Sequence, residues 1–293
     1  MEEYRIVKNN RILRLITGIV LLALFVFVLV NTVRNYDLHS LMHDVQPVEV
    51  TVTVEVTVPV HETQEETVPP ETTEETPAPV TTVDPDSPEG RAAALGLPAP
   101  PDVDVSSWEF ILANASHSIE TYAPPAIETL EGQQFDTRII EPMKAFVAAA
   151  RAEGLSVYLS SGYRDYATQQ YLYNRKINQG YTPEQAATIV APPGTSEHQT
   201  GLVCDITDQY YDPKDWAVLE KTALYQWMSE HCQEYGFIVR YPKDKSGLNT
   251  EEAKTSVTGI IYEPWHYRYV GVEAATYMME NKICLEEFLA LYE

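Results

Sequence analysis

The stretch GTSEHQTGLVCDI, residues 194–206, places an imidazole and a carboxylate close together among apolar and small residues. His198 and Asp205 lie on either side of Gly201, where the chain enters the apolar run GLVCDI. Such a pair is either a satisfied polar pair in the core or part of a metal site. Histidine nitrogen and aspartate oxygen are both ligands that zinc takes in proteins.

A second cluster lies in YEPWHYRY, residues 262–269, where Glu263 and His266 follow the apolar residues GII. Because Pro264 fits neither a continuous helix nor a central strand, we expect the two side chains to flank a bend that turns them into one cleft. Two histidines and one aspartate would leave the fourth position of a catalytic zinc for water. Glu263, which is not needed as a ligand, would then serve as the general base.

A cation that could hold a substrate carboxylate or a developing oxyanion occurs in SSGYRDY, where Arg164 follows an expected strand. The guanidinium suits this role because its fork is bidentate and always charged. Each of these residues also has a structural interpretation: Asp205 as a turn cap, Glu263 and Arg164 as an ion pair, and each histidine as an ordinary core residue. Residue types and spacing alone leave both interpretations open.

Hydrophobic periodicity and helix-stop glycines predict the elements that must position these groups. The expected helices are residues 141–154, 164–180, 182–191, 216–236 and 271–282, and the expected strands are 155–163, 201–206, 237–242 and 259–270. The helix at 182–191 opens with a capping box, in which Thr182 caps and Gln185 reaches back. Helices and short strands mix without strict alternation, which predicts an α+β fold with a small, mostly antiparallel sheet flanked by helices and the metal site at strand ends.

The N-terminal part of the chain has the pattern of a membrane anchor. Residues 15–33 carry no charge and are almost wholly apolar, and about 20 such residues span a bilayer. The basic residues before this run predict that residues 1–14 are cytoplasmic and that everything after the span faces outward. A cleaved signal peptide is the rival interpretation, but no small-x-small cleavage site follows the apolar run.

Residues 34–101 are rich in Thr, Glu, Pro and Val, and we expect them to form an acidic, disordered stalk. The folded domain is expected at 102–293. The net charge of −23, much of it from the stalk, argues against a nucleic-acid partner, because phosphate binding needs a basic face. Nothing in the sequence implies an obligate protein partner.

Three stretches in this order, SSGYRDYATQ, GTSEHQTGLVCDI and EPWHYRYVG, resemble the zinc D,D-carboxypeptidases of the VanY type and the related D,D-dipeptidases and L,D-carboxypeptidases. The resemblance covers most of residues 103–293 and none of the anchor or stalk. It implies that His198, Asp205 and His266 bind Zn²⁺. It further implies that Glu263 is the general base and that Arg164 steadies the substrate or transition state.

The same resemblance implies that Gln169 and Ser196 contact the terminal D-residue of the substrate. Cys204 stands where the family usually has a small aliphatic residue. Strand alternation predicts that its thiol points away from the face that carries Asp205.

The resemblance and the anchor together predict a single-pass protein of the cell membrane whose outward-facing domain removes the C-terminal D-alanine from peptidoglycan stem peptides. One alternative is an L,D-carboxypeptidase that acts on the tetrapeptide stem. Another is a non-catalytic wall-binding module of the same fold, although such a module would have no need for Glu263 beside the metal.

Overall fold

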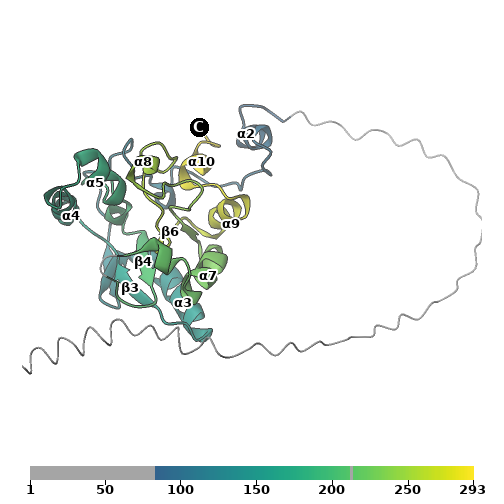
Figure 1. Ribbon diagram of the computed structural model, residues 1–293. Helices are drawn as coiled ribbons and strands as arrows, with labels where there is room; N and C mark the ends of the chain where they lie inside the picture. The colour runs from purple at the N-terminus through teal and green to yellow at the C-terminus, as the bar shows by residue number, and fades with distance from the viewer. Residues whose placement is uncertain (1–82, 212–213) are drawn as a thin grey trace, which may run out of the picture. The chain divides into compact units, whose positions relative to one another are not determined.

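The computed structural model describes residues 83–211 and 214–293, which all belong to the compact unit Thr76–Glu293 (Figure 1). Its α-helices are α2 Pro88–Ala94, α3 Ile140–Ala152, α4 Tyr166–Asn178, α5 Pro183–Ile189, α6 Trp216–Leu219, α7 Ala223–His231, α8 Thr250–Ala253, α9 Val272–Asn281 and α10 Leu285–Leu289. Its 3₁₀ helices are η2 Trp108–Phe110, η3 Thr137–Ile139, η4 Glu197–Thr200 and η5 Cys232–Tyr235. Its strands are β1 Ile127–Leu130, β2 Gln133–Asp136, β3 Tyr158–Ser161, β4 Val203–Thr207, β5 Phe237–Val239 and β6 His266–Tyr269.

The strands form two antiparallel sheets, which confirms the predicted α+β class. One is the hairpin β1–β2, and the other has the order β3-β4-β6-β5. In the larger sheet, Asp205 of β4 is paired with His266 of β6, and Cys204 is paired with Tyr267. Because side chains alternate along a strand, Asp205 and His266 share one face, and Cys204 and Tyr267 share the other.

The face with Cys204 and Tyr267 is covered by the main hydrophobic core, to which α3 contributes Phe146 and α7 contributes Met228. Figure 1 shows α3 and α7 on one side of the strands, with α4 and α5 on the other. Cys204 is fully buried in this core, so its thiol lies away from the face with Asp205, as strand alternation predicted. The opposite face of the sheet is left for polar groups.

The folded unit begins earlier than the predicted boundary at residue 102. Helix α2 lies within the segment assigned to the stalk, and its Ala92 is buried in a second hydrophobic cluster with Phe288 of α10. Arg91 donates hydrogen bonds to the backbone carbonyls of Leu291 and Glu293. The amino-acid composition predicted a continuous stalk, because composition carries no information about the contacts of α2 with the distant C-terminal segment.

Two predicted elements are interrupted in the structure. The long helix expected at 216–236 is divided into α6, α7 and η5. Helix α6 ends at Leu219, and Thr222 starts α7 as its N-cap by accepting from the Tyr225 backbone N–H. The strand expected at 259–270 is reduced to β6. The capping box of Thr182 and Gln185 at α5 is confirmed, whereas the β1–β2 hairpin was not predicted.

The predicted cytoplasmic segment 1–14, the span 15–33 and the stalk up to residue 82 lie outside the described residues. Among the residues that are described, no helix has the length and apolar character needed to cross a bilayer. Cys232 and Cys284 are both free and buried.

Candidate active site

His198 is positioned by a short 3₁₀ turn, η4, that ends at Gly201 in the left-handed conformation with φ 72°. A side chain at position 201 would also place its Cβ 2.9 Å from the Asp136 backbone nitrogen. Glycine is therefore required for the chain to turn from His198 directly into β4, which carries Asp205. The separation of His198 and Asp205 along the sequence is therefore the length of chain that this turn and the start of β4 require.

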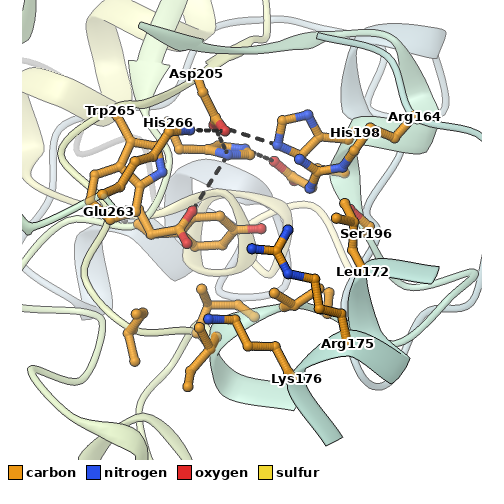
Figure 2. A pocket seen from close by; sticks show the side chains of 18 of the residues that line it. Arg164, Leu172, Arg175, Lys176, Ser196, His198, Asp205, Glu263, Trp265 and His266 are labelled. Atoms are coloured by element: carbon orange, nitrogen blue, oxygen red, sulfur yellow. Dashed lines mark hydrogen bonds and ion pairs between the residues drawn. The ribbon is translucent and has the colours of Figure 1, made fainter. Parts of the chain in front are cut away.

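The structure brings the three predicted ligands together. His198, Asp205 and His266 are buried, and each offers one ligand atom within 4.8 Å of the others. Asp205 Oδ1 lies 3.5 Å from His198 Nε2 and 3.1 Å from His266 Nδ1 (Figure 2). Ligand atoms around one tetrahedral zinc are roughly 3.3 Å apart, given bond lengths of about 2.0–2.1 Å. The described donor set therefore fits zinc in both chemistry and spacing.

The imidazole of His198 is held in a defined tautomer. Its Nδ1 donates to the Gly162 carbonyl at 2.6 Å, which leaves Nε2 as the lone-pair atom that faces Asp205. Burial and the nearby charge of Arg164 lower the pKa of His198 to about 4. The neutral imidazole required of a metal ligand is thus the form present at neutral pH.

His266 is oriented from its other side by Glu197. Its Nε2 lies 3.5 Å from Glu197 Oε2, and both atoms are buried without another hydrogen-bond partner among the described residues. A proton on Nε2 satisfies both atoms and leaves the Nδ1 lone pair directed at Asp205 Oδ1. This arrangement is a carboxylate–histidine pair of the kind that supports metal ligands.

Glu197 is itself fixed by two buried arginines. Its Oε1 accepts from Arg240 Nε at 2.7 Å and from Arg268 Nη1 at 2.8 Å. Burial acts to raise the pKa of Glu197, but the charges of Arg240 and Arg268 outweigh it and hold the pKa well below its usual range. No role for Glu197 was predicted from the sequence, because its partners Arg240, Arg268 and His266 lie in distant segments.

Glu263 lies beside the metal ligands at the predicted bend. Pro264 and Trp265 form a turn, the His266 backbone N–H donates to the Glu263 carbonyl, and Glu263 Oε2 lies 3.6 Å from His266 Nδ1. Burial raises the pKa of Glu263 to about 7, with His266 opposing the rise and the charge of Asp205 adding to it. A bound dication would favour the carboxylate again. Glu263 is therefore placed and tuned for proton transfer near neutral pH.

Arg164 lines the same cavity, and its side chain is held by neutral partners. Its Nε donates to Gln169 Oε1 and its Nη1 donates to Ser161 Oγ, each at 3.0 Å. Among the residues described, Arg164 forms no ion pair with Glu263, so the structural interpretation of those two residues does not apply. The guanidinium thus remains available for a carboxylate from a ligand.

The structure separates the roles of the other two predicted substrate-binding residues. Ser196 is buried and lines the cavity close to His198 and Arg164 (Figure 2). Gln169 is fully buried outside the lining, where its amide accepts from Arg164 and donates to the Ala191 carbonyl at 2.7 Å. Gln169 consequently positions Arg164 from behind.

The cavity that contains these groups has a volume of about 360 Å³, within the range of pockets for small ligands. Lys214 and Tyr241 also line it, and neither was predicted. Lys214 Nζ lies 2.5 Å from Asp205 Oδ2, the oxygen that faces away from the two imidazoles. Lys214 therefore balances the charge of the ligand carboxylate from outside the cluster of donor atoms.

Comparison with known proteins agrees with this geometry. Residues 132–272 match the VanY family, described as D-alanyl-D-alanine carboxypeptidase. A D-alanyl-D-alanine carboxypeptidase of Enterococcus faecalis is 39% identical over 195 residues, which cover 64% of this chain and 67% of that protein.

Two solved structures are similar as well. The D,D-pentapeptidase VanY from a VanB-type vancomycin-resistance cassette, in complex with Zn(II), is 38% identical with a TM-score of 0.50, covering 62% of this chain and 99% of that one. The LD-carboxypeptidase LdcB is 30% identical with a TM-score of 0.54, covering 64% of this chain and 88% of that one.

Proposed function

The chain belongs to the VanY family of D-alanyl-D-alanine carboxypeptidases and is a zinc-dependent metallopeptidase, and we propose that it removes the C-terminal D-alanine from peptidoglycan stem peptides. The observation that carries the proposal is the position of Glu263. Its carboxylate lies 3.6 Å from His266 Nδ1, in the same cavity as the guanidinium of Arg164, which forms no ion pair with a described residue. The cavity thus combines a metal site, a base and a carboxylate receptor.

Zinc, when bound by His198, Asp205 and His266, supplies a Lewis acid that polarises the scissile carbonyl and makes water in the site more acidic. Arg164 binds the terminal carboxylate of the peptide, and Ser196 lies beside it. This contact sets the register of the peptide in the cavity, so that the last peptide bond is presented to Glu263.

Glu263 carries the proton through the reaction. Its carboxylate accepts a proton from the attacking water as the carbon–oxygen bond forms at the scissile carbonyl. The same group then donates that proton to the leaving nitrogen as the carbon–nitrogen bond breaks. The products are free D-alanine and the shortened stem peptide, and Glu263 returns to its starting form.

Mass spectrometry of stem peptides tests this proposal. The zinc-loaded full chain is incubated separately with pentapeptide and tetrapeptide stems, and the loss of one alanine is measured. Cleavage of the pentapeptide alone supports the D,D-carboxypeptidase. Cleavage of neither peptide by zinc-loaded protein would contradict it and would favour a wall-binding module.

A second candidate function is L,D-carboxypeptidase activity on the tetrapeptide. It is favoured by one observation, the similarity of the fold to the LD-carboxypeptidase LdcB at a TM-score of 0.54. The zinc site and base serve either cut, because the two reactions differ in the residue on the amino side of the scissile bond. Loss of alanine from the tetrapeptide in the same experiment would establish this alternative.

The proposal extends to the location of the enzyme. The uncharged run at residues 15–33, preceded by Arg5, Lys8, Arg11 and Arg14, supports a single-pass anchor with the catalytic unit on the cell-wall side. Protease treatment of intact protoplasts tests it. A C-terminal tag should be digested and an N-terminal tag protected, whereas protection of both would contradict the proposed orientation.

A further inference from the structure

The active-site cavity contains two cations that the reaction at the scissile bond does not use. Arg175 and Lys176 line the cavity together with Arg164 and Glu263. Figure 2 shows both side chains rising from their helix toward the hollow below the metal ligands, on the side away from Asp205. Among the described residues neither forms an ion pair, and the ammonium of Lys176 lies 5.6 Å from the ring centroid of Tyr181.

Helix α4 connects these cations to the group that receives the terminal carboxylate. Gln169, which holds Arg164, lies near the start of α4, and Leu172 and Lys176 follow it on the same helical face. At 1.5 Å per residue, the backbone of Lys176 is roughly 10 Å along the helix axis from that of Gln169. One wall of the cavity therefore carries positive charge at both of its ends.

Helix polarity explains only part of this arrangement. Basic residues in the last turn of a helix complement its dipole, and Arg175 and Lys176 are in the last turn of α4. The dipole requires no particular direction of their side chains, yet both line the cavity, where Arg175 is exposed and Lys176 is half-buried. Two cations in the lining of an active-site cavity favour the binding of a negatively charged ligand. The chain as a whole is acidic, with a net charge of −23, so this local positive charge is not a general property of its surface.

We propose that Arg175 and Lys176 form a subsite for a second carboxylate of the substrate, on a residue that precedes the scissile bond. The inference rests on the proposed function. In that reaction the leaving D-alanine has a single carboxylate, which Arg164 receives. A second carboxylate must consequently belong to the part of the stem on the amino side of the cut.

Two positions of a stem peptide can supply this carboxylate. One is the free α-carboxylate of a γ-linked glutamate at the second residue, and the other is a side-chain carboxylate at the third. In both cases conversion of the acid to a primary amide removes the charge and keeps nearly the same shape. The subsite would make the enzyme selective for stems whose carboxylate is not amidated.

The experiment compares matched pairs of pentapeptides that end in D-Ala-D-Ala. One pair has the acid or the amide at the second residue, and the other pair has it at the third. The full chain, loaded with zinc, should give kcat/KM values about twofold to fivefold higher for the acid of one pair, which is the effect expected of a partly exposed charge pair. The pair that shows the preference identifies the position of the carboxylate.

The double variant Arg175→Ala and Lys176→Ala should bring the acid-to-amide ratio of kcat/KM close to one. Lys221→Ala serves as the matched control, since Lys221 is exposed and lies outside the cavity lining, and it should keep the preference. The ratio is insensitive to the amount of folded protein, so partial unfolding of the double variant cannot imitate the result. Raising the salt concentration should also lower the ratio in the unaltered chain.

Equal cleavage of acid and amide in both pairs by the unaltered chain would overturn the subsite and leave the carboxypeptidase function intact. A preference that survives in the double variant would also overturn it. An equal loss of activity on acid and amide would leave their ratio unchanged and would likewise count against the subsite. Failure to cleave any of the four peptides would refute the proposed function, and the subsite with it.

Discussion

His266 Nε2 lies 3.5 Å from Glu197 Oε2, and neither of these buried atoms has another hydrogen-bond partner in the described part of the chain. The residue directly before one metal ligand therefore supports the other histidine of the site. Because Arg240 and Arg268 occupy Oε1, only Oε2 of Glu197 is available to His266.

Glu197→Gln should weaken zinc binding by roughly 10- to 100-fold, the effect usual for the loss of a group that orients a metal ligand. The amide keeps the shape but no longer offers a charged acceptor to the Nε2 proton of His266. Zinc affinity is measured by competition with a chelator. The absorption spectrum of the cobalt-substituted protein should change as the coordination changes.

Glu286→Gln is the control for the arginine network, because Glu286 binds Arg240 at 2.7 Å and, in the described part of the chain, forms no ion pair with His266. It should leave zinc affinity nearly unchanged. Equal zinc affinity in Glu197→Gln and the unaltered chain would show that Glu197 serves only the arginines.

Glu263→Ala should retain stoichiometric zinc and the fold but lose turnover by roughly 100- to 10,000-fold, the usual contribution of a general acid–base group. His198→Ala should instead reduce the metal content. Metal analysis and kcat are measured on the same samples. Normal turnover in Glu263→Ala would remove the base assignment.

Gln169→Ala should lower kcat/KM on D-Ala-D-Ala peptides by roughly tenfold or more, mainly through KM, because Arg164 loses the acceptor that holds its Nε. Gln170→Ala is the matched control, since Gln170 is exposed on the same helix. Unequal effects of the two variants on KM, measured at saturating zinc, test whether Gln169 positions the arginine. Similar kinetics in both variants would leave Gln169 without that role.

Glu286 should make stability depend on pH. Burial acts to raise the pKa of Glu286, but the charge and hydrogen bonds of Arg240 outweigh it, so the folded-state pKa is lowered. The ion pair therefore stabilises the fold above the ordinary carboxyl pKa of about 4.3, and this stability is lost as pH falls through the lowered folded-state pKa.

Glu286→Gln should reduce the free energy of unfolding by about 2 kcal/mol at pH 7, the scale of a hydrogen bond to a charged group, and by less near pH 3. Urea unfolding at both pH values measures the difference. Glu280→Gln, at an exposed position on α9, should show little effect at either pH. A penalty for Glu286→Gln that is equal at both pH values would contradict the linkage.

Local patterns were enough to predict much of the fold. The capping box at Thr182 and Gln185 depends on residues within one turn, and it forms as expected. The ends of α3 and α4 are close to the predicted ones, since their stop signals at Gly154 and Gly180 are local. The division of residues 216–236 was missed, because Thr222 acts as a cap only once α6 and α7 pack separately.

The candidate site was likewise predictable in part from the sequence and in part only from the fold. Residue types and their order pointed to His198, Asp205, His266, Glu263 and Arg164, because the chemistry of a metal ligand, a base or a carboxylate receptor belongs to each side chain. The distances among them follow from the register in which Asp205 is paired with His266, and from the turn that Gly201 permits.

The roles of Glu197, Gln169 and the Arg175–Lys176 pair could not be read from residue order. Each depends on which atoms of a distant segment lie opposite: His266 Nε2 for Glu197, Arg164 Nε for Gln169, and the cavity itself for the two cations. Sequence specifies the chemistry that each residue can perform. Burial and long-range packing, which form only in the folded chain, select the partner on which that chemistry acts.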